Sequence, residues 1–295
     1  MANALLFPID PLNPRRVDSH FAREARAARE LGLAVALVDH DALLRGDARE
    51  ATRRVPEGLG PAVYRGWMVP VRAYEAFDAA LRARGAVAAT TPDAYARAHE
   101  LPGWYEHFAA FTPRTALLPL AVGDRPDASE LAAAASQLPG GAAMVKDWVK
   151  SRKHEWDTAC FVPDLADTAG LASVVDAFLT GQGVFLTGGV ALRAYEEFTG
   201  PEARVWWVDA VPVLSTAHPD SPGQPVAPPL SESLRSAVAA FEAPFVTTDL
   251  ALRADGVWRV VEVGDGQVSD LPATTEATEL LGALATGLNP PIGTD

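Results

Sequence analysis

The chain has 295 residues, of which 48% are hydrophobic and 21% charged, and its formal net charge is −13 at pH 7. This composition is typical of a soluble globular protein with two domains or one large one, and the negative charge argues against a nucleic-acid binder whose whole surface is basic. A single cysteine, Cys160, excludes an intrachain disulfide framework and a zinc site built from several thiolates.

The N-terminal residues show no targeting signal. The first ten, MANALLFPID, have no cationic segment, and their apolar run stops at Pro8. No apolar stretch reaches the 18 residues that a membrane span needs. We therefore expect a cytoplasmic protein that does not enter the membrane.

Short apolar runs alternate with helical periodicity in the first third of the chain. Strands are expected at residues 4–9, 34–40, 62–69 and 87–90, and helices at 17–31, 72–84 and 92–101. Such alternation predicts a parallel sheet with right-handed crossovers. At the end of the second strand, Asp39, His40 and Asp41 form either a ligand cluster or an ordinary polar strand exit.

The pattern changes near residue 112. Prolines at 113, 119 and 126 predict a crossover between domains, so we divide the chain into residues 1–115 and 116–295. In the second part, helices are expected at 128–138, 170–183 and 231–243, and strands at 142–149, 159–163, 184–198, 204–214, 245–254 and 257–266. Asp255-Gly256 predicts a tight hairpin between the last two strands, and residues 219–229 form a proline-rich loop.

All the lysines of the chain lie in one short segment, MVKDWVKSRKHEW, at residues 144–156. They are Lys146, Lys150 and Lys153, and every other basic position is arginine. Because an ammonium is a compact point charge and a guanidinium a planar fork, this clustering indicates chemistry that distinguishes the two. A solvated charged hairpin is the alternative.

The second half resembles the ATP-grasp superfamily over roughly residues 116–280. The resemblance rests on an ordered set: a strand with a lysine, a cationic loop, a helix, a strand ending in RAYEEF, then PEARVWW, TTDLAL and VVEVGDG. The preceding segment is similar to the domain that comes before the ATP-grasp module in many members. The resemblance implies an α/β fold in which an N-terminal parallel βα domain precedes a two-lobed α+β ATP-grasp module.

The resemblance also implies a nucleotide site. Lys146 would contact the phosphates of ATP, and Ala194 and Tyr195 would meet the adenine edge at a hinge, with Glu197 at the ribose. The loop departs from the glycine- and serine-rich cover of many members, so Lys150, Arg152 and Lys153 would hold the phosphates by side chains. Alternatively, Glu196 and Glu197 are ordinary strand-end charges, and His154 is either an acid–base group or structural.

Two arginines lie inside apolar strands, where a bare charge is unfavourable. Arg193 and Arg204 are therefore candidates to bind phosphate or a substrate carboxylate, and we assign catalytic roles to Arg204 and Lys153. Glu202 is the alternative, purely structural, partner of Arg204.

By the same resemblance, Asp249 and Glu262 would hold Mg²⁺ from paired strands. Members of the superfamily carry Glu-x-Asn at this point, whereas this chain has Glu262, then glycine at 264, then Asp265. Asp265 would take the place of the asparagine through a turned backbone.

The function implied is that of an ATP-dependent carboxylate–amine ligase, using ATP and Mg²⁺ and passing through an acyl phosphate. The alternatives are phosphoryl transfer to a small molecule and a non-catalytic nucleotide-binding module. P-loop, protein-kinase and dinucleotide fingerprints are absent from the sequence. The expected partners are a small-molecule or peptide carboxylate and an amine, with no nucleic acid and no membrane, and a homodimer is an open alternative to a monomer.

Overall fold

The computed structural model describes residues 4–218 and 226–288. Contacts divide the chain into two units, each assembled from segments that are distant in sequence. The first holds the chain up to His99, Pro201–Leu250 and the chain from Glu262 onward, and the second holds Glu100–Gly200 and Ala251–Val261. The expected boundary between residues 115 and 116 stays a prediction, because these units are discontinuous in sequence.

The first unit opens with a sheet whose four principal strands are parallel, as predicted. Their order is β3-β1-β4-β5, and β2 adds antiparallel to β1. The strands are β1 (Ala4–Asp10), β2 (Asn13–Val17), β3 (Ala34–Val38), β4 (Gly60–Tyr64) and β5 (Ala86–Ala88). The helices are α1 (Ala22–Glu30), α2 (His40–Leu44), α3 (Ala48–Ala51), α4 (Val71–Arg82) and α5 (Pro92–His99).

The first helix begins later than its periodicity predicts. Residues 13–17 return along β1 as β2, and Asp18 then caps a short 3-10 turn, Ser19–Phe21, by accepting a hydrogen bond from His20 N. The apolar residue Val17, which fits the helical spacing, pairs with Ile9 in the hairpin instead.

The same unit contains most of a second sheet, of order β11-β10-β12-β13. Its strands are β10 (Phe198–Val208), β11 (Val211–Ala217), β12 (Phe245–Arg253) and β13 (Trp258–Asp265), followed or interrupted by α9 (Glu232–Ala240) and α10 (Ala277–Gly287). Gly256, in the predicted hairpin turn, has φ +84°. Part of the proline-rich loop, residues 219–225, lies outside the described residues.

One hydrophobic core joins the two ends of the chain. It packs Phe7 and Phe21 with Trp206 of β10 and with Leu280 and Leu284 of α10. The N-terminal sheet and the C-terminal helix therefore stabilise each other within the first unit.

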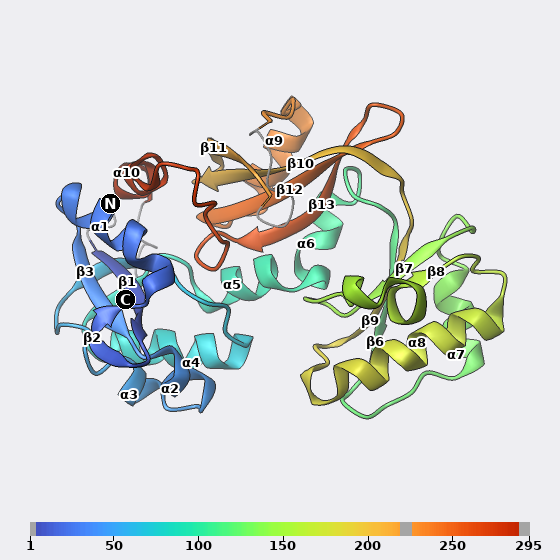
Figure 1. The fold of residues 1–295 in the computed structure, drawn as a ribbon, viewed down its shortest axis with the longest axis horizontal. Helices are drawn as coiled ribbons and strands as arrows, with labels where there is room; N and C mark the ends of the chain where they lie inside the picture. The colour runs from blue at the N-terminus through green and yellow to red at the C-terminus, as the bar shows by residue number, and fades with distance from the viewer. Residues whose placement is uncertain (1–3, 219–225, 289–295) are drawn as a thin grey trace. The chain divides into compact units, whose positions relative to one another are not determined.

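The second unit is built on an antiparallel sheet of order β6-β9-β7-β8. Its strands are β6 (Thr115–Pro119), β7 (Ala143–Lys146), β8 (Phe161–Val162) and β9 (Gly189–Ala194). The helices are α6 (Leu101–Phe108), α7 (Ala128–Ala135) and α8 (Thr168–Gln182). Helices α7 and α8 pack on this sheet through Leu131 and Phe178 (Figure 1).

Three local expectations in this unit are corrected. Residues 115–119, expected within a crossover, form β6; this strand lies at the sheet edge, where Pro119 is tolerated because no partner needs its missing N–H. The strand expected at 184–198 is only β9, since Gly183–Phe185 form a 3-10 turn. The strand expected at 159–163 is shortened by a π-helix, Trp156–Cys160.

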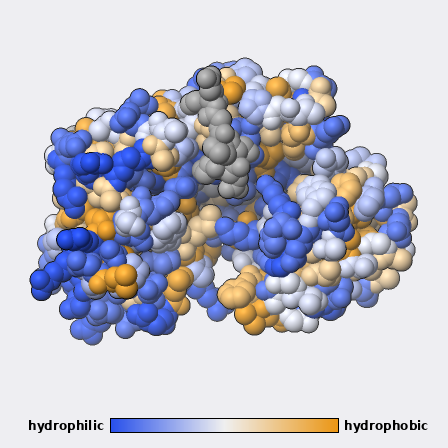
Figure 2. All heavy atoms as spheres, viewed as in Figure 1, coloured by the Kyte–Doolittle hydropathy of each residue, from blue (hydrophilic) through white to orange (hydrophobic). Residues whose placement is uncertain are grey.

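On the face drawn in Figure 2, hydrophilic residues predominate and hydrophobic ones are scattered in small groups. Such scattered apolar residues are normal for a globular protein. Among the residues that the structure describes, no helix is both long and apolar enough to cross a bilayer.

Candidate active site

Arg204 of β10 and Asp249 of β12 form a buried, two-pronged ion pair. The Arg204 Nε donates to Asp249 Oδ1 at 2.8 Å, and Nη2 donates to Oδ2 at 2.9 Å. Only 9% of Arg204 and 2% of Asp249 are exposed. Burial alone would raise the pKa of Asp249, but the charge and hydrogen bonds of Arg204, with a smaller effect of His218, hold it at about 2. The anion that Arg204 was expected to need is thus inside the protein, and it is Asp249 rather than Glu202.

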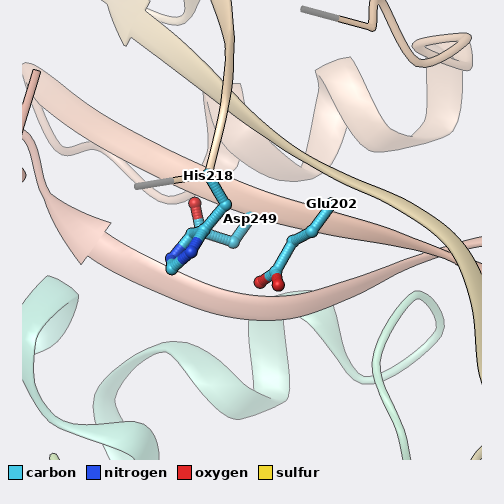
Figure 3. A group of neighbouring side chains, drawn as sticks. All are labelled: Glu202, His218 and Asp249. Carbon is cyan, nitrogen blue, oxygen red and sulfur yellow. The ribbon is translucent and has the colours of Figure 1, made fainter. Parts of the chain in front are cut away.

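His218, which the sequence analysis did not single out, completes this cluster. Its Nε2 lies 3.4 Å from Asp249 Oδ2 and 3.2 Å from Arg204 Nη2. Burial lowers the pKa of His218, but the hydrogen bond and charge of Asp249 outweigh burial and raise it. Figure 3 shows the imidazole and the carboxylates of Asp249 and Glu202 gathered from neighbouring strands; one ligand atom from each lies within 4.8 Å of the others. A lone histidine after a strand carries no local motif, so only the fold reveals it.

Glu262 of β13 presents a carboxylate beside this cluster. It is half-buried, and no hydrogen bond or ion pair to its side chain occurs among the described residues. Its charge nevertheless contributes to raising the pKa of Arg204, whose own burial acts in the opposite direction. Glu262 is therefore an oxygen ligand close enough to Arg204 to act with it.

Asp265 does not join Glu262, contrary to the expectation. Burial alternates along β13 from Glu262 to Asp265, and residues three apart in a strand face opposite sides. Asp265 is fully buried; its Oδ1 accepts from Gln267 N at 2.8 Å, while Oδ2 is buried without a partner among the described residues. Burial raises the pKa of Asp265 to about 7. It is a buried core acid rather than a metal ligand beside Glu262.

The glycine at the asparagine position is explained by close packing. A Cβ on Gly264 would lie 3.0 Å from Thr247 Oγ1 and 3.3 Å from Ser269 Oγ. These two hydroxyls are 2.8 Å apart and hydrogen-bonded to each other. A longer side chain would have to displace them, so two hydroxyls stand where an asparagine amide was expected.

In the second unit, Lys146 ends β7 and opens a tight turn. The turn closes at Ser151, which bridges back to Lys146, and Asp147 N donates to Lys150 O at 2.9 Å. Lys146 is 9% exposed, whereas Lys150 and Lys153 are exposed. The structure therefore brings Lys146 and Lys150 together at one strand end.

Asp147 holds this turn in shape, a role that the sequence analysis missed. It is fully buried and accepts hydrogen bonds from Val149 N at 2.7 Å and from Lys150 N. It also accepts from Gln182 Nε2 at 2.6 Å, which ties the turn to the end of α8. An aspartate directly after a strand, followed two and three residues later by backbone donors, is the local signal of such a turn.

Arg152 is engaged within its own loop. Its Nε and Nη2 donate to the carboxylate of Glu155 at 2.6 and 2.7 Å, and Nη1 donates to Gln182 Oε1 at 3.4 Å. The hydrogen bond to Glu155 raises the pKa of Arg152. Because three of its nitrogens already donate within the chain, Arg152 is placed to shape the loop, while Lys150, Lys153 and His154 project outward.

The expected hinge joins β9 to β10 and borders a cavity of about 420 Å³. Ala194, Tyr195 and Glu196 line it, together with Tyr105, Ala109, Thr112, Arg114, Pro139 and Arg259. Tyr195 is 40% exposed and packs edge-on against Phe161 at 5.2 Å. The volume falls in the range of small-molecule sites.

The two hinge glutamates differ. Glu196 is an ion-pair partner, since Arg259 donates to it at 2.9 and 3.0 Å and Arg253 lies 3.2 Å away. Glu197 is exposed, and its carbonyl accepts from Ala254 N at 3.0 Å. The structural alternative therefore holds for Glu196, and Glu197 keeps an exposed carboxylate.

Arg193 is satisfied largely by neutral groups. It donates to Val261 O at 2.6 Å, to Val260 O at 3.3 Å and to Thr112 Oγ1, and its guanidinium lies 5.8 Å from the ring centre of Trp104. Carbonyl oxygens and an aromatic face thus supply what the sequence argument assigned to an anion.

A family model that describes an ATP-grasp domain, the third family of its clade, matches residues 135–284. The chain belongs to this ATP-grasp family. The match covers half of the chain and includes the lysine turn, the hinge, Arg204, Asp249 and Glu262. The resemblance that the sequence predicted is confirmed.

Solved structures of ATP-grasp proteins share the fold. The D-cycloserine synthetase DcsG is 17% identical, with a TM-score of 0.64 over 97% of this chain and 100% of that one. The ATP-grasp ligase PsnB, complexed with a minimal precursor, Mg and ADP, is 12% identical, with a TM-score of 0.58 over 97% and 98%. D-alanyl-alanine synthetase A from Vibrio cholerae O1 biovar eltor is 12% identical, with a TM-score of 0.56 over 97% and 98%. A search of curated proteins finds no match.

Proposed function

We propose that this ATP-grasp chain is an ATP-dependent ligase that joins a carboxylate to an amine. The observation that carries the proposal is the buried Arg204–Asp249 pair with the unengaged carboxylate of Glu262 beside it. A fixed guanidinium and a nearby metal-binding oxygen are what a site needs to neutralise a phosphoryl group in transfer. The synthetases and the ligase that share the fold support the reaction class.

In the proposed reaction, a carboxylate oxygen of one substrate attacks the γ-phosphorus of ATP, and ADP leaves. The amine nitrogen of the second substrate then attacks the carbonyl carbon of the acyl phosphate. The bond from that carbon to the phosphate oxygen breaks, inorganic phosphate departs, and the nitrogen loses a proton. The protein contributes position and charge rather than covalent chemistry.

The residues divide these tasks. Lys146, at the strand end, and the exposed Lys150 and Lys153 would neutralise the ATP phosphates. Arg204 is held by Asp249 and also donates to Asp270 O at 3.3 Å, so its guanidinium needs no rearrangement before it meets a developing negative charge. The hinge at Ala194 and Tyr195 would hold adenine, with Glu197 at the ribose.

The donor set fits Mg²⁺ in part. Glu262 offers a carboxylate that suits a hard cation, whereas both oxygens of Asp249 are engaged by Arg204 and Asp265 faces the other way. We propose that Glu262 is the principal protein ligand of a Mg²⁺ ion that arrives with the nucleotide. When bound, the ion would neutralise phosphate charge.

Product analysis tests the proposal. Purified protein with ATP, Mg²⁺ and a panel of carboxylates and amines is assayed for ADP, phosphate and amide, and hydroxylamine is added to trap an acyl phosphate as a hydroxamate. Amide formed together with ADP and phosphate supports the ligase. A stable phosphoester would instead identify a kinase, and ATP binding without turnover would identify a non-catalytic module.

A further inference from the structure

The parallel sheet of the first unit has a reversal point that the proposed nucleotide and phosphate residues do not use. The chain passes from β1 to β3 on one side of β1 and then to β4 on its other side. The direction of winding therefore reverses between β1 and β4. In open α/β sheets, ligands bind outside the carboxyl ends of the strands at such a point.

An aromatic surface stands at this place. Asp18 N donates to Pro8 O at 2.8 Å, which puts residues 18–21 beside the carboxyl end of β1, and Trp67 follows the carboxyl end of β4. The rings of His20 and Trp67 are 4.5 Å apart, and those of Phe21 and Trp67 are 4.9 Å apart. Two loops from adjacent strands thus build one surface.

Polar contacts fix this surface in place. The Trp67 Nε1 donates to Asp18 Oδ2 at 3.3 Å, and His20 Nε2 lies 2.7 Å from Asp270 Oδ1. Trp67 nevertheless remains 39% exposed, and the side chains of His20 and Asp270 are 38% and 44% exposed. We call these four residues, Asp18, His20, Trp67 and Asp270, the Trp67 platform. An aromatic side chain that is held rigid but left open is suited to bind a ligand.

The charges around the Trp67 platform select a cation. Asp18 and Asp270 place two carboxylates at the edges of an indole face, whose own electron density attracts positive charge. The neighbouring arginines are engaged elsewhere: Arg65 pairs with Glu24, and Arg23 donates to backbone carbonyls of residues 271–275. Close by, His40 lies within the electrostatic range of Asp18, and burial lowers its pKa, so it adds no positive charge near neutral pH.

One residue connects the Trp67 platform with the proposed reaction centre. The main-chain oxygen of Asp270 accepts a hydrogen bond from Arg204 at 3.3 Å, and its side chain contacts His20. A group bound on Trp67 is therefore one residue away from the guanidinium that we propose to meet the acyl phosphate.

We infer that the Trp67 platform binds the cationic group of the amine substrate. The inference rests on the proposed ligase function and names its amine as a molecule with an ammonium or guanidinium group. The ring face holds the cation, the two carboxylates orient it, and the contact through Asp270 places it beside Arg204.

The test uses the full chain, labelled with ¹⁵N in its tryptophans, and tetramethylammonium chloride as the probe. Its neutral counterpart of similar shape, tert-butanol, is the matched control, and ionic strength is kept constant. We expect a saturable shift of the Trp67 indole resonance with tetramethylammonium and none with tert-butanol; loss of one signal in Trp67→Phe assigns the resonance. In Asp270→Asn the binding should weaken by roughly fivefold, the upper end of an exposed charge contact.

Controls separate this inference from the function on which it rests. Phe185→Leu removes an aromatic ring that is 81% exposed in the other unit and should leave the titration unchanged. ATP–Mg²⁺ affinity, measured by calorimetry, should be the same in Trp67→Phe, Asp270→Asn and wild type. Absence of ATP binding in wild type counts against the proposed function. Intact ATP binding with no saturable probe shift, or with equal shifts from both probes or in Asp270→Asn, overturns the inference.

Discussion

Glu262 and Arg204 show how one side chain gains meaning from its neighbours. Each looks costly in an apolar strand when the sequence is considered alone. In the structure the cost for Arg204 is offset by Asp249, whereas Glu262 keeps its oxygens available. A residue that is satisfied within the protein supports the site, and a residue that is not satisfied awaits a ligand.

We expect Glu262→Gln to lower turnover by orders of magnitude, because the variant keeps the shape but loses the charge that would hold Mg²⁺. The Mg²⁺ concentration for half-maximal rate should rise. Stability should change by about 1 kcal/mol or less, since the carboxylate makes no hydrogen bond among the described residues. Steady-state kinetics over a range of Mg²⁺ concentrations and a denaturant titration check both expectations. Normal turnover, or ready unfolding, would show that Glu262 is structural.

The ion pair between Arg204 and Asp249 makes a separate prediction about stability. Arg204→Met should destabilise the fold by about 3–5 kcal/mol, because it leaves the buried Asp249 charge without its partner. The double variant Arg204→Met with Asp249→Leu should recover most of that loss, while remaining inactive. Urea unfolding of both proteins measures the difference. If the double variant is as unstable as the single one, the loss is due to packing rather than charge.

At the scale of elements, the lysine turn is the feature that the sequence indicated best. Asp147 and the bridge between Lys146 and Ser151 fix the turn that carries Lys146 and Lys150. The outward direction of Lys150 and Lys153 is then set by the loop, not by their own hydrogen bonds. The turn thus presents ammonium groups on a rigid support.

Replacing Lys146, Lys150 and Lys153 together by arginine preserves charge and changes only the head group. We expect a large loss of turnover, because a planar fork cannot take the positions of a compact ammonium. The control is Arg125→Lys, an exposed ion pair with Asp176, which should leave turnover unchanged. Near-normal activity of the triple variant would mean that the clustering of lysines reflects codon usage alone.

Much of the fold was legible in the sequence, and the exceptions have physical causes. The parallel order of the first strands follows from strict alternation of strand and helix, and Lys146 was placed correctly at a strand end. The β1–β2 hairpin was missed because Val17 satisfies both a helical and a strand pattern, and long-range pairing with Ile9 decides between them. His218 was missed because its partners, Arg204 and Asp249, are distant in sequence. Asp265 was misassigned because adjacency along a strand was taken for a shared face.

At the scale of the whole molecule, the buried acid Asp265 makes stability depend on pH. Its pKa, about 7 in the folded chain, lies above the ordinary value of 3.8, so folding takes up a proton between these pH values and stability falls as pH rises through them. Asp265→Asn mimics the protonated acid and does not titrate. The variant should match wild type near pH 4 and exceed it increasingly up to pH 7, by on the order of 4 kcal/mol, with no further gain above.

Thermal unfolding at several pH values from 4 to 8 measures this gain. The matched control is Asp255→Asn, because Arg253 and the Val257 amide hold the pKa of that exposed aspartate at about 2. Its stabilising effect is present above the unfolded pKa and is lost only as pH falls towards 2, so the difference from wild type should be constant over this range. A constant difference for Asp265→Asn as well would show that Asp265 is ionised in the folded state.

The core shared by Phe7, Phe21, Leu280 and Leu284 has a consequence for the birth of the chain. A ribosome releases β1 and α1 first and α10 last, so the apolar face of the N-terminal sheet has no cover until synthesis is nearly complete. Contacts of such sequence separation form slowly, and an uncovered sheet invites aggregation in the meantime. The nascent protein therefore spends most of its synthesis as a client for chaperones, and its first strands are among the last to reach their final packing.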